Sequence, residues 1–225
     1  ITRLYVKTSA DQAFVRTGMG GQQPIIDGGA LVVPVVHEIV PVSLQTMRLD
    51  VDRAGPDALI TGDNLRADVA AEFYIKVQKI REHILAAATS LGERSVDAES
   101  VKHLVNQKLV SALRTVAATR PLHELHTKRD EFAQAVQVIV EKDLAHNGLT
   151  LESVTISRLD QTPPVAMRGE DNVFDAQGLR TIAEITQRQR VERNMIEREA
   201  DQKVVAQDVT RDQFVFEQEV ARANA

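Results

Sequence analysis

The sequence predicts an α+β fold that ends in a long helix, and three observations support this prediction. Apolar and polar residues alternate over residues 65–77, as they do in a half-buried strand. Between about residues 80 and 146 the apolar residues recur with helical spacing, and turn residues separate the segments. Residues 179–225 contain no glycine and no proline, and as a single helix they would extend for roughly 70 Å.

These patterns divide the chain into four parts. We expect a β-rich subdomain over residues 1–50, an αβ subdomain over residues 51–162, a linker over residues 163–178 and the start of a coiled-coil type helical arm over residues 179–225. Aromatic residues make up 4% of the sequence and tryptophan is absent. The core is therefore expected to consist mainly of valine, isoleucine, leucine and alanine.

The first 50 residues carry short strand-like runs that are separated by glycine-rich turn clusters. The apolar run at residues 31–36 predicts a strand, but Pro34 cannot donate a hydrogen bond to a ladder. Pro34 is therefore expected on an edge strand or at a bulge, and Pro41 gives the same signal. Residues 47–52 alternate between apolar and charged side chains, which predicts a half-buried strand.

A hairpin is the clearest element of the sequence. The strand over residues 65–77 follows a turn at residues 61–64, and residues 58–60 are its expected partner. A returning strand over residues 149–159, with a bulge near Ser153, is expected to complete the sheet. The hairpin residues expected to face the core are Leu65, Ala67, Val69, Ala71, Phe73, Ile75 and Val77.

Three helices are predicted between the hairpin and the returning strand. The first ends at Gly92, the second is capped by Asp97, and the third begins with a capping box of Thr127 and Asp130 and ends at Gly148. The residues expected to face inwards are Ile80, Ile84, Leu85, Ala88 and Leu91 in the first helix, Val101, Leu104, Val105, Leu109, Leu113 and Val116 in the second, and Phe132, Val136, Ile139, Val140 and Leu144 in the third.

Composition excludes several classes of partner and site. The formal net charge is −5 and there is no basic stripe interleaved with aromatic residues, so we do not expect nucleic-acid binding. Cysteine is absent, which excludes disulfides, thiolate metal ligands and cysteine nucleophiles. No run of about 18 apolar residues predicts a transmembrane helix. Because the sequence begins with Ile1 and not with methionine, we expect further sequence upstream.

Residue patterns that could indicate a cofactor-binding, metal-binding or catalytic site are better explained as turns and solvent-exposed surfaces. The glycine cluster at residues 17–22 lacks the dinucleotide-binding spacing, because Gln23 stands where the third glycine belongs. His123 and His126 are spaced for one helical face, but the spacing supplies no third metal ligand. The carboxylates are spread along helices and strands beside lysine or arginine. We therefore expect no catalytic, cofactor-binding or metal-binding residues, and no enzyme.

Four segments resemble the stomatin/prohibitin/flotillin (SPFH, band 7) family. Residues 58–69 resemble the segment in which a strand ends in a tight turn, and residues 122–132 resemble the family's pattern of leucine, arginine and phenylalanine. Residues 143–156 resemble its helix, glycine and strand sequence. Residues 11–18 resemble the opening of flotillin-like bacterial membrane proteins. The family usually has Asp-Gly in the tight turn, whereas Asn64 follows aspartate here, and asparagine also tolerates positive φ.

The resemblance implies a function in assembly. It covers about residues 5–160, and a coiled-coil arm usually follows in the family. It implies a membrane-associated scaffold that forms a large homo-oligomeric ring or cage, contacts lipid and organises or encloses membrane proteins or lipid microdomains. It also implies a place at a bacterial inner membrane, with the soluble part on the cytoplasmic face. The alternatives are a regulator that restrains a membrane-bound protease, a soluble adapter that binds partners through the arm, and an enzyme whose pocket the sequence does not reveal.

The apolar stretch at residues 25–44 has two interpretations. Two prolines and several polar residues prevent it from forming a spanning helix, so it either fills the β core or lies against a membrane. The resemblance favours the membrane for part of it. The candidate membrane-contact residues are Val32, Val33, Val35 and Val36.

The arm carries a broken apolar seam among nearly balanced charges. An isolated helix of this polarity would be only marginally stable, so a partner helix is expected, most simply from another copy of the chain. The seam is too irregular to specify a parallel dimer. The candidate oligomer-contact residues are Leu179, Ile182, Met195, Val205, Val209 and Phe216.

Overall fold

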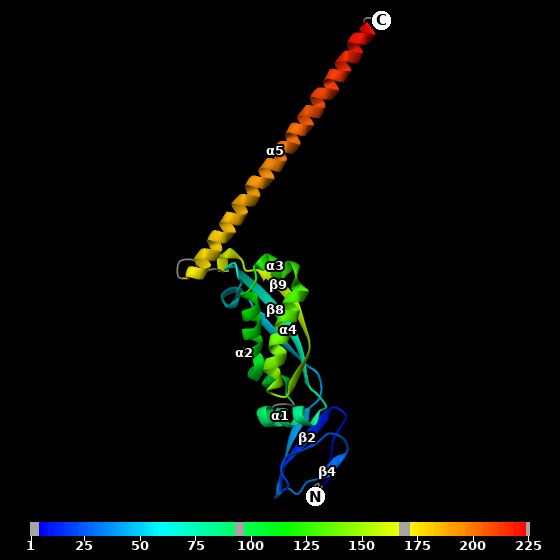
Figure 1. Ribbon diagram of the computed structural model, residues 1–225, viewed down its shortest axis with the longest axis vertical. Helices are drawn as coiled ribbons and strands as arrows, with labels where there is room; N and C mark the ends of the chain where they lie inside the picture. Colours follow the sequence, from blue (N-terminus) through cyan, green and yellow to red (C-terminus); the bar gives the residue numbers. More distant parts are fainter. Residues whose placement is uncertain (1–4, 93–96, 167–171, 224–225) are drawn as a thin grey trace. The chain divides into compact units, whose positions relative to one another are not determined.

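The computed structural model describes residues 5–92, 97–166 and 172–223. The fold is α+β, as the sequence predicts, with strands in the N-terminal part and a long C-terminal helix (Figure 1). The chain divides into two compact units, Ile1–Gly178 and Leu179–Ala225. The first unit contains every strand that the structure describes, and the described residues of the second unit are helical.

Five short strands form the N-terminal β part. Strand β1 (Tyr5–Lys7) pairs with β4 (Gly29–Leu31) in a two-stranded antiparallel sheet. Strand β2 (Gln12–Gly18) is the centre of a second antiparallel sheet, between β3 (Gln23–Ile25) and β5 (His37–Ser43). Ala13, Phe14, Val15 and Val42 fill its interior, so the small core is aliphatic apart from one phenylalanine.

The predicted strand at residues 31–36 is wrong. Strand β4 ends at Leu31, and a turn follows in which the N–H groups of Val36 and His37 both donate to the Val33 carbonyl, at 3.0 and 2.9 Å. Pro34 therefore lies in a turn and not in an edge strand or a bulge, because its fixed φ and missing N–H suit a turn better than a ladder. Pro41 does lie in an edge strand, since β5 pairs within its sheet with β2 alone.

A four-stranded antiparallel sheet forms the centre of the first unit. Strand β8 (Arg66–Val77) pairs with β6 (Met47–Arg53), β7 (Leu59–Ile60) and β9 (Leu149–Gln161). A short 3-10 helix, Gly55–Asp57, precedes β7. The alternate apolar residues of β8 are all buried, so the predicted register is confirmed. The tight turn is also confirmed, with Asn64 at a φ of 60°.

Strand β9 contains the predicted irregularity and a second one. Tyr74 is opposite Ser153 and Ile75 is opposite Leu151, so Glu152 is the extra residue of a bulge beside Ser153. A second register shift, which the sequence did not reveal, leaves Ser157 without a directly opposed residue. Bulges of this kind bend and twist a strand, which protects an edge from pairing with another chain.

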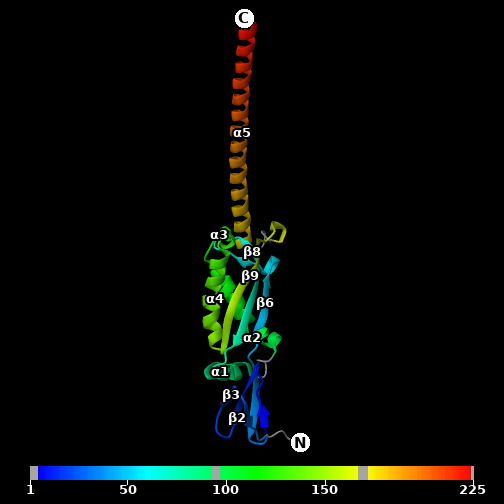
Figure 2. The ribbon, with the colours of Figure 1, turned by 90° about the vertical axis from the view of Figure 1, so that its right-hand side faces the viewer.

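Helices cover one face of this sheet. Helix α2 (Ala98–Ala117) packs against α4 (Arg129–Ala145), and these two helices contact β6 and β9 respectively. The short α3 (Leu122–Thr127) connects them. Helix α1 (Arg81–Leu91) contacts β2, β3 and β5 as well as β8, so it joins the N-terminal β part to the central sheet (Figure 2).

Most predicted helix ends are confirmed. Gly92 and Gly148 follow α1 and α4 with φ values of 59° and 70°, and the Asp97 carboxylate caps α2 by accepting two backbone N–H groups. Two residues predicted to face inwards are exposed instead, Ile80 by 43% and Leu104 by 39%. Ile80 precedes α1 and does not belong to its helical face, which explains the first error.

The predicted capping box is wrong. Thr127 is the last residue of α3, and its hydroxyl donates to the His123 carbonyl at 2.8 Å. Lys128 occupies the N-cap of α4 and makes no side-chain capping bond. Because α3 ends at Thr127 and α4 begins at Arg129, Lys128 alone separates the two helices. Thr127 therefore cannot serve as the N-cap of α4 in front of Asp130.

The long helix begins earlier than predicted. Helix α5 is Val173–Ala223, so the expected linker over residues 163–178 contains a 3-10 helix, Pro164–Ala166, and the first turns of α5. Residues 167–171 of that linker lie outside the described residues. Gly178 lies inside α5, and a Cβ atom there would lie 2.6 Å from the Asn64 carbonyl oxygen. Close contact with the tight turn therefore requires glycine at this position.

None of the described helices combines the length and the apolar character that crossing a membrane requires.

Candidate functional site

Two loops meet at one end of the N-terminal β part and expose apolar side chains. We define the apolar tip as Met19 from the β2–β3 turn together with Val33, Val35 and Val36 from the β4–β5 turn. The Met19 N–H donates to the Val36 carbonyl at 3.3 Å, which holds the two loops together. Gly18 allows this approach, because its φ is 121° and a Cβ atom would lie 2.0 Å from the Val36 oxygen.

The ring of His37 contacts both loops of the apolar tip. Its Nδ1 accepts the N–H of Val33 at 3.1 Å, and its Nε2 lies 3.2 Å from the Met19 carbonyl oxygen. A backbone N–H on one side and a carbonyl on the other fit the neutral tautomer with the proton on Nε2. His37 therefore connects both loops through hydrogen bonds that each use a different ring nitrogen.

The structure separates the four candidate membrane-contact residues into two groups. Val35 is 92% exposed and Val33 and Val36 are also exposed, whereas Val32 is only 4% exposed and fills the core. We therefore remove Val32 from the proposed contact set. Met19 is 78% exposed and was missed, because its glycine-rich surroundings were interpreted only as a turn. A large apolar residue at the tip of such a turn is the signal that identifies it.

A hollow of about 480 Å³ lies where the N-terminal β part meets the end of β8, and it does not resemble an active site. Its charged residues are two lysines, each already paired: Lys76 with Glu152 and Lys79 with Asp27. Hydrogen bonds from Lys76 and then Thr46 lower the pKa of Glu152. This carboxylate is therefore held ionised as part of a surface network, and the described residues that line the hollow include no carboxylate of their own.

The two histidines with metal-like spacing lie on the exposed side of α3. Their neighbour Glu124 is instead close to Arg120 and Lys128, at 3.6 and 3.7 Å. In the ranges that the structure describes, no three histidine, aspartate or glutamate side chains come together as metal ligands.

Helix α5 is the second surface with exposed apolar side chains. Of the six candidate oligomer-contact residues, Met195, Val205, Val209 and Phe216 are 51–66% exposed, while Leu179 and Ile182 are partly buried. Further apolar residues of α5 are equally exposed and were not among the candidates: Ile185, Val191, Ile196, Val204, Phe214, Val215 and Val220. Three of them, Ile185, Phe214 and Val215, also lie outside the predicted seam, which is therefore only part of the apolar surface of this helix.

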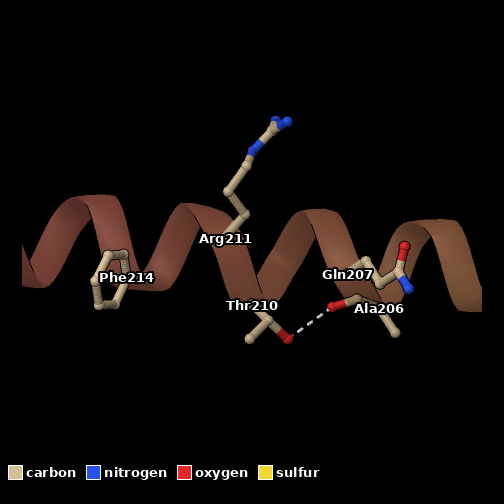
Figure 3. Close-up of a pocket in the computed structure, with 5 residues that line it drawn as sticks. All are labelled: Ala206, Gln207, Thr210, Arg211 and Phe214. Carbon is tan, nitrogen blue, oxygen red and sulfur yellow. Dashed lines mark hydrogen bonds between the residues drawn. The ribbon is translucent and has the colours of Figure 1, made fainter.

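A shallow groove lies on the surface of α5. Ala206, Gln207, Thr210, Arg211 and Phe214 line it, and its volume is about 520 Å³. Figure 3 shows Arg211 projecting from one side of the helix and Thr210 from the other, with the Thr210 hydroxyl bonded to the Ala206 carbonyl at 2.8 Å. The groove exists because two small side chains, Ala206 and Thr210, follow each other at helical spacing beside Phe214.

Comparisons with known proteins agree with this arrangement. The SPFH domain / Band 7 family model matches residues 6–198. The chain is 42% identical to the flotillin family inner membrane protein YqiK of Escherichia coli over 223 residues, which are 99% of this chain and 40% of that protein.

Two further relatives are more distant. Identity is 36% over 191 residues with the flotillin family inner membrane protein sll1021 of Synechocystis, covering 83% of this chain and 28% of that protein. It is 30% over 167 residues with the flotillin-like protein FloT of Bacillus subtilis, covering 68% and 31%. The chain thus spans well under half the length of each of these relatives.

Proposed function

The chain belongs to the SPFH domain / Band 7 family, and from that premise we propose that it is the membrane-associated, self-assembling part of a structural scaffold. The observation that carries the proposal is where the exposed apolar side chains lie, since most of them belong to the apolar tip or to α5. One surface suits lipid and the other suits another helix. Copies of the chain would form a large ring or cage that organises or encloses membrane proteins.

The membrane part of the proposal is supported by the apolar tip. Its side chains are held outwards by a turn and two hydrogen bonds to His37, so they do not need to rearrange before they enter a bilayer. Two relatives are named inner membrane proteins. We therefore propose that this scaffold lies at a bacterial inner membrane, with the first unit on the cytoplasmic face. Proteolysis of spheroplasts and of inside-out vesicles would test on which side of the membrane the first unit lies.

Flotation tests the tip with matched substitutions. Burying one valine side chain contributes about 1.5–3 kcal/mol, so Val35→Asp should reduce binding to phosphatidylethanolamine–phosphatidylglycerol vesicles roughly tenfold or more. Val138→Asp is the control, because Val138 is 69% exposed on α4 and outside the tip. Val32→Asp should instead unfold the N-terminal β part, because Val32 is buried. Equal flotation of Val35→Asp, Val138→Asp and the unchanged protein would show that the apolar tip does not contribute to membrane binding.

The assembly part is supported by α5. A 51-residue helix whose apolar side chains are about half exposed gains most of its stability only when it packs against a partner. We favour a scaffold over a soluble adapter because the tip provides a lipid-facing surface that an adapter does not need. We favour it over restraint of a protease because lipid and a second copy of the chain together account for both apolar surfaces. A bound protease is therefore not needed to explain them. Light scattering tests this part, and a protein that stays monomeric both free and on vesicles would exclude the scaffold.

A further inference from the structure

The sulfur atoms of this chain all belong to methionine. The sequence contains four methionines and no cysteine, so a peroxide finds thioethers to oxidise and no thiol. Met47 is 7% exposed in β6, whereas Met19 is 78% exposed and Met195 is 57% exposed. Met167 lies outside the described residues. Among the methionines that the structure describes, Met19 therefore has the most accessible side chain, and it belongs to the apolar tip.

The neighbours of Met19 leave its thioether open to solvent. Gly18 precedes it and Gly20 and Gly21 follow it, and none of these residues has a side chain that could cover the sulfur. The space around the loop is also empty, because a Cβ atom at Gly20 or Gly21 would have no heavy atom within 4 Å. A small oxidant can therefore reach the sulfur without any movement of the loop.

The backbone of Met19 is fixed on both sides of this open side chain. Its N–H donates to the Val36 carbonyl at 3.3 Å, and its carbonyl oxygen lies 3.2 Å from Nε2 of His37. Neither interaction uses the side chain. A chemical change at the sulfur therefore alters the polarity of the apolar tip and leaves the hydrogen bonds between its two loops in place.

Met19 is also the member of the apolar tip that a peroxide can oxidise, since the other three members are valines with saturated side chains. The sulfur donates an electron pair to one oxygen of hydrogen peroxide, and an S–O bond forms as the O–O bond breaks. The departing hydroxide takes the proton of the transferred hydroxyl group and leaves as water. The sulfur is oxidised by two electrons, the peroxide is reduced, and the product is methionine sulfoxide.

A sulfoxide at this position opposes entry into a bilayer. Its oxygen is a hydrogen-bond acceptor, and burial of such a group without a donor is unfavourable. The N–H groups of Met19, Gly21 and Val36 already donate to carbonyl oxygens of the two loops. The Val33 N–H already donates to His37. These groups cannot also serve the sulfoxide oxygen, so the oxidised side chain keeps its hydration only outside the lipid.

We infer that Met19 is a redox-sensitive site, at which oxidation of the thioether by hydrogen peroxide weakens the contact between the apolar tip and lipid. The change is reversible, because methionine sulfoxide reductases return the sulfoxide to the thioether. This inference rests on the proposed membrane contact of the tip. It adds a modification that regulates that contact.

Flotation before and after oxidation tests the inference. The protein is treated with hydrogen peroxide, the peroxide is destroyed with catalase, and binding to phosphatidylethanolamine–phosphatidylglycerol vesicles is measured. Loss of one buried apolar side chain of this size weakens affinity roughly tenfold or more, so the treated protein should bind about tenfold more weakly than the untreated protein. Treatment with MsrA and MsrB together should restore binding, since each enzyme reduces one sulfoxide epimer.

Variants separate Met19 from the other methionines, and each variant is compared with itself before and after peroxide. Binding by Met19→Leu should not respond to peroxide, because leucine is apolar and contains no sulfur. Met195→Leu is the matched control and should respond like the unchanged protein, because Met195 lies on α5 outside the tip. Met19→Gln, with a polar side chain of similar length, should bind as weakly as the oxidised protein. Mass spectrometry should find an added oxygen atom on Met19.

The outcomes distinguish this inference from the proposed function. The redox site is wrong if peroxide weakens Met19→Leu as much as the unchanged protein, or if Met19 gains no oxygen while Met195 does. It is also wrong if Met19→Gln binds as well as the unchanged protein while Val35→Asp binds more weakly, and in that case the lipid contact of the tip stands. If Met19→Gln and Val35→Asp both bind like the unchanged protein, the proposed lipid contact fails as well.

Discussion

Removal of the Asp175 carboxylate should destabilise the first unit strongly. Asp175 is 4% exposed in the first turn of α5, and its Oδ1 accepts a hydrogen bond from Arg66 Nε at 2.5 Å. Arg66 opens β8, its side chain is 12% exposed, and it also donates to the Pro56 carbonyl at 2.9 Å. This pair therefore fastens the start of α5 to the central sheet from a buried position.

The expected loss of stability follows from the charged group that the substitution leaves without a partner. In Asp175→Asn the Arg66 guanidinium stays buried without its carboxylate, and breaking a buried pair in this way typically costs about 3–5 kcal/mol. Because Arg66 keeps its bond to Pro56, we expect a loss near the lower end, about 3 kcal/mol. The control is Glu184→Gln, which removes the partner of Arg180 in a pair whose side chains are 62% and 81% exposed. That change should cost about 0.3–0.5 kcal/mol.

Urea unfolding followed by circular dichroism measures both variants. A midpoint shift at constant slope reports the change in the free energy of unfolding. The double variant Arg66→Met with Asp175→Leu should recover much of the loss, because it leaves no buried charge. If Asp175→Asn costs no more than Glu184→Gln, or if the double variant is worse than Asp175→Asn, the buried pair does not fasten α5 to the sheet.

Three further substitutions test the core, a helix end and a cap. Phe73→Ala should cost about 3–5 kcal/mol in urea unfolding, because Phe73 is fully buried, whereas Val138→Ala at an exposed site should cost less than about 0.5 kcal/mol. Gly148→Ala should lower the thermal midpoint, since a Cβ atom would lie 2.3 Å from the His83 carbonyl oxygen; an unchanged midpoint would contradict the close approach of α1 to this turn. Hydrogen bonds from the Ser100 hydroxyl and backbone lower the pKa of Asp97 in the folded state, so its stabilising effect exists above the unfolded pKa and is lost as the pH falls through the folded one. The difference in thermal midpoint between the unchanged protein and Asp97→Asn should therefore be largest near neutral pH and shrink below about pH 4, and a constant difference would exclude this cap.

The local elements could be predicted because their signals are short-ranged. The alternation of β8 reflects which side of one strand is buried, and the positive φ at Gly92 and Gly148 reflects a requirement of a single residue. The cap at Asp97 depends on two N–H groups within three residues. Each of these features is determined by neighbours in the chain, so the sequence alone was sufficient to predict the fold class and the central hairpin.

The errors arose where distant residues decide the outcome. The sequence placed the start of the long helix after Gly178, because neither glycine nor proline follows that residue. In the structure, the turn at Asn64 approaches so closely that only glycine fits, and the Arg66–Asp175 pair links the first turn of α5 to the sheet. Contacts between residues more than 100 positions apart therefore override the local signal.

The candidate surfaces divide in the same way. The sequence by itself determined that residues 31–36 are apolar and that the arm is helical, since both follow from composition and spacing. Only the tertiary structure decided that Val32 is buried while Val35 is 92% exposed, and that Met19 joins the exposed valines at the tip. The physical reason is that exposure depends on the turn at Pro34 and on the hydrogen bonds of His37 to both loops, and these place side chains from two segments on one surface.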